Sequence, residues 1–134
     1  MSSIYEVFET DTTAEETGIK LNYGEFSFII ARAGGANKRF NKLLERRLEP
    51  HQRSIQAGLM DEKLARKILA ECFAETVVLG WDNVPDREGK PIAFSKEACA
   101  KLLLELPELF DELREQATKA SNFRQAKREA TSQD

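Results

Sequence analysis

Apolar side chains recur at helical spacing between residues 61 and 79, which corresponds to about five turns of an α-helix. Asp61 can cap the start of this helix, and Gly80 can end it. Charged residues occupy the opposite face, so the helix must bury one face against another layer of the fold. The predicted inward face consists of Leu64, Ala65, Ile68, Leu69, Cys72, Phe73, Thr76 and Val77.

A second periodicity, of two residues, precedes this helix. Apolar and polar residues alternate over residues 19–23 and 26–30, and Gly24 lies in the short stretch between them. The pattern predicts a β-hairpin that ends at the Gly34-Gly35 pair. Residues 1–18 are rich in Thr and Glu and are predicted to form a flexible N-terminal arm, with a short edge strand as the alternative.

Residues 37–53 predict a basic amphipathic helix. Asn37 can act as its N-cap, while Phe40, Leu44 and Leu48 recur at four-residue spacing and form its buried face. Pro50 should kink or break the helix near Glu49, because proline lacks a backbone N–H. The basic residues on the remaining surface are Lys38, Arg39, Lys42, Arg46, Arg47 and Arg53.

Two further helices are predicted in the C-terminal half. Residues 81–94 contain two prolines and a glycine and are predicted to form a loop or a short irregular ribbon. Ser95 can cap a helix that ends at Leu106, and Pro107 can begin the next helix. Residues 124–134 lack apolar periodicity and are predicted to form a flexible tail.

These elements predict an α+β fold that is mainly α, with an N-terminal β-hairpin followed by about four helices in one compact domain. The globular domain should span residues 19–123, between the arm and the tail. A chain of 134 residues can bury an adequate core without disulfides or metals. The predicted core comprises Phe28, Ile30, Leu44, Leu48, Leu64, Ile68, Phe73, Leu102, Phe110 and Leu113.

Composition and charge exclude several classes of protein. The net charge of −3 argues against dominant binding to nucleic acid, and no apolar run is long enough to span a membrane. Acidic residues near the N-terminus do not fit a signal peptide, so we expect the protein to stay in the cell that makes it. Cys72 and Cys99 form no metal or redox motif and are interpreted as buried thiols.

No group of residues predicts catalysis, a metal site or a cofactor site. His51 has neither an acid nor a thiol near it in sequence, so it is interpreted as a solvent-facing residue rather than a general base. Asp82 and Asp86 lack the spacing of a calcium loop, and Gly34-Gly35 lacks the rest of a phosphate-binding motif. We therefore expect a protein that is not an enzyme and binds no small-molecule substrate. A small hydrolase is a distant alternative.

The basic helix and one tryptophan are the candidate partner-binding features. The exposed face of the helix can be a solvated face, a protein-docking face or a nucleic-acid-binding face. No aromatic residues alternate with its basic residues, and nucleobases would need such residues to stack on. Trp81 can lie in the core or form part of a binding hot spot. The candidate partner-binding residues are Arg39, Lys42, Arg46, Arg47, Arg53 and Trp81.

Several segments between residues 17 and 125 resemble the tail assembly chaperones of long-tailed bacteriophages. The similarity is carried by FSFIIARAGGANKRF (residues 26–40), KLLE (42–45), VVLGWDNV (77–84), GKP (89–91), LL (102–103), LPELF (106–110) and ASNFR (120–124). These motifs are structural signatures and do not mark a chemical site.

The resemblance implies a non-enzymatic role in tail assembly. Such chaperones keep the long tape-measure protein soluble, help tail-tube subunits to polymerise around it, and are absent from the mature virion. The implied partners are the tape-measure protein and the tail-tube protein, in the cytoplasm of the host cell. Self-association into a homo-oligomer is a further expectation. A longer form made by frameshifting is common in the family. The alternative function is a small nucleic-acid-associated regulator that uses the basic helix at residues 37–53.

Overall fold

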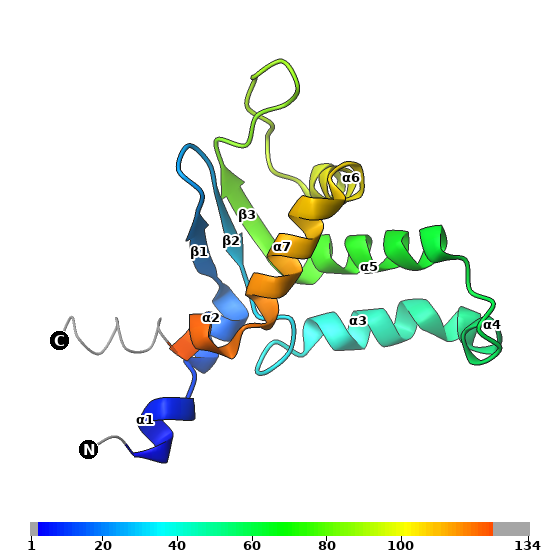
Figure 1. The fold of residues 1–134 in the computed structure, drawn as a ribbon, viewed down its shortest axis with the longest axis horizontal. Helices are drawn as coiled ribbons and strands as arrows, with labels where there is room; N and C mark the ends of the chain where they lie inside the picture. Colours follow the sequence, from blue (N-terminus) through cyan, green and yellow to red (C-terminus); the bar gives the residue numbers. More distant parts are fainter. Residues whose placement is uncertain (1–2, 125–134) are drawn as a thin grey trace.

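The computed structural model describes residues 3–124 and has an α+β fold that is mainly α (Figure 1). A helical segment at residues 120–124 follows the last of the named elements. In chain order, these elements are α1 (Ile4–Phe8), α2 (Thr12–Thr17), β1 (Ile19–Asn22), β2 (Ser27–Ile30), α3 (Arg39–Leu48), the 3₁₀-helix η1 (Glu49–His51), α4 (Gln52–Gln56), α5 (Glu62–Thr76), β3 (Val78–Asp82), α6 (Lys96–Glu105) and α7 (Pro107–Thr118).

The three strands form an antiparallel sheet in the order β1-β2-β3. The predicted hairpin is confirmed, because β1 pairs with β2 and Gly24 adopts a φ of 96° in the turn between them. In the register of the sheet, Phe28 on β2 lies opposite Leu21 on β1 and opposite Trp81 on β3. The central strand therefore places a fully buried aromatic side chain in the middle of the sheet.

Helices α3 and α5 form a long pair that projects from the sheet, with α4 at its far end (Figure 1). Helix α6 packs on α5, and α7 lies across the sheet. Two contacts fix α7 there. The Tyr23 hydroxyl donates to Glu112 at 2.8 Å, and the Ala33 N–H donates to the carbonyl of Ala117 at 3.0 Å.

Aromatic side chains join these layers into one core. Phe73 on α5 makes edge contacts with Phe40 on α3 and Phe110 on α7, with ring centroids 5.7 and 5.4 Å apart. Six predicted core residues are confirmed as buried, namely Phe28, Ile30, Ile68, Phe73, Phe110 and Leu113. Leu44, Leu48 and Leu102 are partly buried, and the prediction was wrong for Leu64, which is exposed.

The first elements are helices, whereas the sequence predicted a flexible arm at residues 1–18. Ser3 and the Glu6 side chain form a capping box at the start of α1, and the Asp11 carboxylate accepts from the N–H of Ala14 in α2. Ala14 and Glu15 are buried, so α2 is part of the globular body. The Thr- and Glu-rich composition concealed these caps.

The structure also corrects the predicted C-terminal end of α5. The sequence predicted a helix to residue 79 and a loop from residue 81, but α5 ends at Thr76 and residues 78–82 form β3. The hydroxyl of Thr76 donates to the carbonyl of Cys72 at 2.7 Å, within the last turn of the helix. The β-branched residues that follow favour an extended backbone, and Gly80 pairs with Ile29 instead of capping a helix.

Asn37 is not the N-cap of the basic helix. Lys38 occupies that position and makes no capping bond with its side chain, whereas Asn37 is buried and bonded to backbone carbonyls. Four other predicted helix boundaries are confirmed. Asp61 and Ser95 cap their helices, Pro107 begins α7, and Pro50 lies in the 3₁₀-helix that interrupts the basic segment. The tail predicted from residue 124 lies outside the described residues, except for Arg124 itself.

Candidate partner-binding surface

The burial of one face of α3 determines which of its basic side chains are accessible. Phe40 is buried against Phe73, and Leu44 and Leu48 pack against the same core. A helix fixed in this way directs its remaining side chains to solvent. Lys42 and Arg46, which lie one turn apart, are consequently exposed on α3, and Arg53 is exposed on α4.

Two of the predicted partner-binding residues are engaged within the fold. Arg39 donates from Nε to Oδ1 of Asn37 and from an Nη to the carbonyl of Glu16, both at 3.0 Å. Arg47 forms a salt bridge of 2.8 Å with Glu71 on α5, and this hydrogen bond raises the pKa of Arg47. These two arginines hold α3 to its neighbours and are less available to a partner than Lys42, Arg46 and Arg53.

Lys42, Arg46 and Arg53 make no salt bridge within residues 3–124. Lys42 and Arg46 line an open depression of about 480 Å³ together with Glu45, Glu49 and Gln52. The two acidic residues reduce the positive potential locally. Between residues 38 and 57, however, there are six basic and only two acidic residues. This segment can therefore attract an acidic partner.

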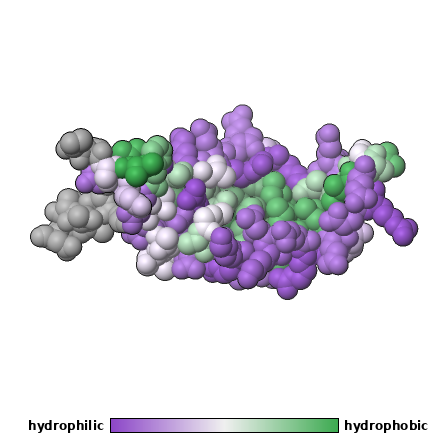
Figure 2. Space-filling model, turned by 90° about the horizontal axis from the view of Figure 1, so that it is seen from below, coloured by the Kyte–Doolittle hydropathy of each residue, from purple (hydrophilic) through white to green (hydrophobic). Residues whose placement is uncertain are grey.

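Apolar surface lies beside these charges. Figure 2 views the molecule from the side on which α3 lies in Figure 1 and shows an apolar band flanked by polar side chains. Leu43, Leu44 and Leu48 of α3 are only partly buried by the core. A band of this kind, with exposed basic groups near it, suits the apolar face of a partner helix.

Trp81 is not part of this surface. Its side chain is 8% exposed, and its ring makes edge contacts with Phe28 and Phe94. Its indole N–H donates to the carbonyl of Ile92 at 2.8 Å and so attaches the 84–94 loop to β3. Of the two alternatives for Trp81, the structure supports a core position, and a binding hot spot would need an accessible ring.

Gly34 and Gly35 lie in the joint between β2 and α3. The sequence indicated this joint but not the residues that pack against it. The N–H of Arg32 donates to the carbonyl of Glu15, and the Arg32 guanidinium forms a salt bridge with the buried Glu15 carboxylate. The same guanidinium lies 6.0 Å from the ring centroid of Phe123. Gly35 sits directly against the Glu15 carboxylate and the Arg32 guanidinium, so a side chain at this position would collide with the salt bridge.

Asn37 completes this joint. Its Nδ2 donates to the carbonyls of Arg32 and Thr76, at 2.9 and 3.1 Å, while its Oδ1 accepts from Arg39. The side chain therefore connects the end of β2, the end of α5 and the start of α3. The only signal in the sequence was an asparagine directly after a glycine pair, which is equally typical of a helix cap.

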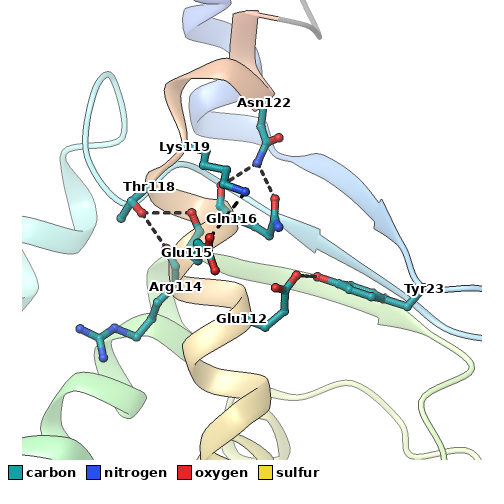
Figure 3. A network of polar contacts seen from close by, with 8 residues as sticks. All are labelled: Tyr23, Glu112, Arg114, Glu115, Gln116, Thr118, Lys119 and Asn122. Carbon is teal, nitrogen blue, oxygen red and sulfur yellow. Dashed lines mark hydrogen bonds and ion pairs between the residues drawn. The ribbon is translucent and has the colours of Figure 1, made fainter.

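A second set of polar contacts anchors α7 (Figure 3). Burial and the hydrogen bond to Glu112 raise the pKa of Tyr23, so its hydroxyl stays protonated and donates from the hairpin to α7. At the other end of the helix, Asn122 donates from Nδ2 to the backbone and side-chain oxygens of Gln116, at 2.8 and 3.0 Å. These bonds hold the segment after α7 against the last turns of that helix.

The remaining candidates for chemistry are dispersed. His51 is half-buried in η1, and Asp82 lies 4.0 Å from Lys20. The Asp86 carboxylate accepts from the N–H groups of Glu88 and Lys90 and so shapes a turn. In residues 3–124, no three His, Cys, Asp or Glu side chains are grouped as metal ligands would be. No helix of the same range is long and apolar enough to cross a membrane.

The two cysteines are confirmed as buried thiols. Burial raises the pKa of Cys72, and it raises the pKa of Cys99 to about 12. Because the thiolate is the reactive form, both should be inert to Ellman's reagent in the native protein near pH 8. We expect both thiols to react promptly in about 6 M guanidinium chloride, which unfolds most domains. Rapid reaction of either thiol under native conditions would contradict the burial described above.

The family model described as "YdaY prophage protein" matches residues 35–133, which include the basic segment, α5, β3, α6 and α7. No curated protein and no solved structure matches the chain.

Proposed function

Because the chain belongs to the YdaY prophage protein family, we propose that it is a non-enzymatic tail assembly chaperone that binds the tape-measure protein of its phage. It would act in the host cytoplasm and be absent from the mature virion. The family supports a phage-associated role, and the resemblance of residues 17–125 to tail assembly chaperones is the basis for the more specific assignment.

The observation that carries this proposal is the apolar band of α3 with Lys42 and Arg46 beside it, two basic residues that form no salt bridge within residues 3–124. Tape-measure proteins are long and rich in helices, and an unassembled amphipathic helix exposes an apolar face that promotes aggregation. A chaperone has to cover that face without chemistry. The band can bury apolar surface, while the bases steer acidic flanks of the helix towards it.

A charge-reversal variant tests the proposed surface. Lys42→Glu with Arg46→Glu should leave the fold intact, because neither side chain forms a salt bridge in the described part of the chain. Arg47 is left unchanged, since a glutamate there would face Glu71. We expect association with a helical tape-measure fragment to slow by about tenfold at low salt, as measured by stopped-flow fluorescence.

The matched control reverses the charge of two basic residues elsewhere in the chain. Arg87→Glu with Lys96→Glu gives the same net charge but alters the 84–94 loop and the start of α6, away from the α3 surface. This control should associate at the parental rate. The difference between the variants should fade as salt rises, because screening weakens the steering. Equal rates for all three proteins at low salt would refute the α3 surface as the docking site.

The same salt series discriminates the alternative function. A nucleic-acid-associated regulator using residues 37–53 would bind a DNA or RNA duplex. The logarithm of its affinity would fall steeply and linearly with the logarithm of the salt concentration. Binding to the tape-measure fragment should instead persist at high salt, because the buried apolar surface is insensitive to screening. Tight duplex binding without fragment binding would favour the regulator.

A further inference from the structure

Helix α2 and the helical segment at residues 120–124 lie side by side at one end of the molecule, although they come from opposite ends of the described chain (Figure 1). The N–H of Asp11, the residue that caps α2, donates to the carbonyl of Phe123 at 3.2 Å. Phe123 is fully buried beside the Arg32 guanidinium, which also forms the salt bridge with Glu15 of α2. Arg32 therefore connects both segments to the joint after β2. We call α2 together with residues 119–124 the clasp.

The clasp is packed separately from the main core. Ala14 and Phe123 are buried, but neither belongs to the continuous apolar cluster that joins the sheet to α3, α5, α6 and α7. Helix α2 buries only Ala14 and Glu15, and α1 buries no residue, so α1 is positioned through α2. Gly18 has a φ of 99° and connects α2 to β1, where it can act as a hinge. A small buried cluster of this kind can open while the main core stays folded.

Hydrogen bonds attach each half of the clasp to the body of the fold. The N–H of Arg32 donates to the carbonyl of Glu15 at 2.9 Å, and the Arg39 guanidinium donates to the carbonyl of Glu16 at 3.0 Å. In the other half, the Asn122 side chain donates to the last turns of α7. Because Arg32 also forms the salt bridge, it holds α2 through both its backbone and its side chain.

We propose that the clasp is a conformational device in which α2 and residues 119–124 open and close together. The coupling passes through the Arg32 guanidinium, because the Phe123 ring lies against it and shields its salt bridge with Glu15 from water. Displacing Phe123 would hydrate the salt bridge and weaken the attachment of α2. In the other direction, the departure of α2 removes the N–H donor of Asp11 from the Phe123 carbonyl and uncovers the ring.

Opening of the clasp would release helix α1, because α1 has no buried residue of its own. Its exposed apolar side chains, Ile4, Tyr5 and Phe8, would then move independently of the sheet. A molecule that binds residues 119–124 only in the open state would therefore free α1. By linkage, a molecule that holds α2 in place would stabilise the closed position of residues 119–124 by the same coupling free energy. The clasp thereby transmits the state of one end of the described chain to the other.

Two neighbouring backbone amides report separately on the clasp and on the body. The Arg32 N–H donates to the carbonyl of Glu15 in the clasp, whereas the Ala31 N–H donates to the carbonyl of Val77, beside β3. Hydrogen exchange of the full chain, resolved residue by residue with NMR, therefore compares the opening of the clasp with that of the body. We expect Phe123→Ala to raise the exchange rate of the Arg32 amide relative to that of Ala31 by at least about tenfold.

A control variant and a reciprocal variant complete the test. Leu103→Ala removes a side chain of α6 that is as deeply buried as Phe123, and it should leave the ratio of the two exchange rates unchanged. Asp11→Ala removes the carboxylate that caps α2 but keeps the N–H that donates to Phe123. It should accelerate exchange of the Asn122 amide in the other half of the clasp. A ratio that does not rise in Phe123→Ala would overturn the proposal, and so would an Asp11→Ala protein in which α2 exchanges faster while Asn122 does not.

Discussion

Replacing Phe73 by alanine is expected to lower the free energy of unfolding by about 3–5 kcal/mol. The side chain is 1% exposed and touches the rings of both Phe40 and Phe110. It therefore joins α3, α5 and α7, and its removal leaves a cavity between these three helices. Urea unfolding followed by circular dichroism measures the change.

Leu64 provides the matched control on the same helix. It is 37% exposed, so Leu64→Ala should cost about 1 kcal/mol or less. The pair of variants tests the register of α5, because a rotation of the helix would exchange the two costs. A loss below about 1 kcal/mol for Phe73→Ala would place that ring at the surface and contradict the core described here.

Gly35→Ala should be the second most damaging substitution, at about 2–4 kcal/mol. Gly35 has a φ of 56°, which costs any other residue free energy, and a Cβ there would collide with the Glu15 carboxylate. The same Cβ would lie 2.9 Å from Cδ of Arg32. The substitution would therefore separate the buried salt bridge that fixes α2 to the joint. Thermal and urea unfolding of the variant give the measurement.

Gly34→Ala measures the cost of backbone strain alone, without the Cβ collision expected for Gly35→Ala. Gly34 has a φ of 135°, but a Cβ added there meets no atom within 4 Å. Its cost should exceed about 1 kcal/mol and remain smaller than that of Gly35→Ala. Two variants as stable as the parent that fail to bind a phosphorylated ligand would instead make the glycine pair an anion site.

Local signals in the sequence were sufficient for most of the helices. Asp61, Ser95 and Pro107 each start a helix, because a capping side chain or a proline acts within one turn and needs no distant partner. Gly24 fixed the hairpin for the same reason. Helix register was predicted for Phe73 and Ile68, but not for Leu64, since the first turn of α5 extends beyond the core.

The missed features depend on contacts between residues far apart in the chain. Strand β3 pairs with β2, about fifty residues earlier, so the helical periodicity before Val78 concealed it. Asn37 resembled a cap, yet its partners include the carbonyl of Thr76. The sequence indicated a basic helix but could not separate Arg39 and Arg47, which are bonded within the fold, from the accessible Lys42 and Arg46.

Co-expression with the tape-measure protein of the same prophage tests the central proposal most directly. The quantity to measure is the fraction of tape-measure protein that remains in the supernatant after centrifugation of the lysate. We expect it to be insoluble when expressed alone, soluble with the parent chain or with the Arg87→Glu, Lys96→Glu control, and largely insoluble with Lys42→Glu, Arg46→Glu. A tape-measure protein that stays insoluble beside abundant, soluble parent chain would contradict the chaperone function.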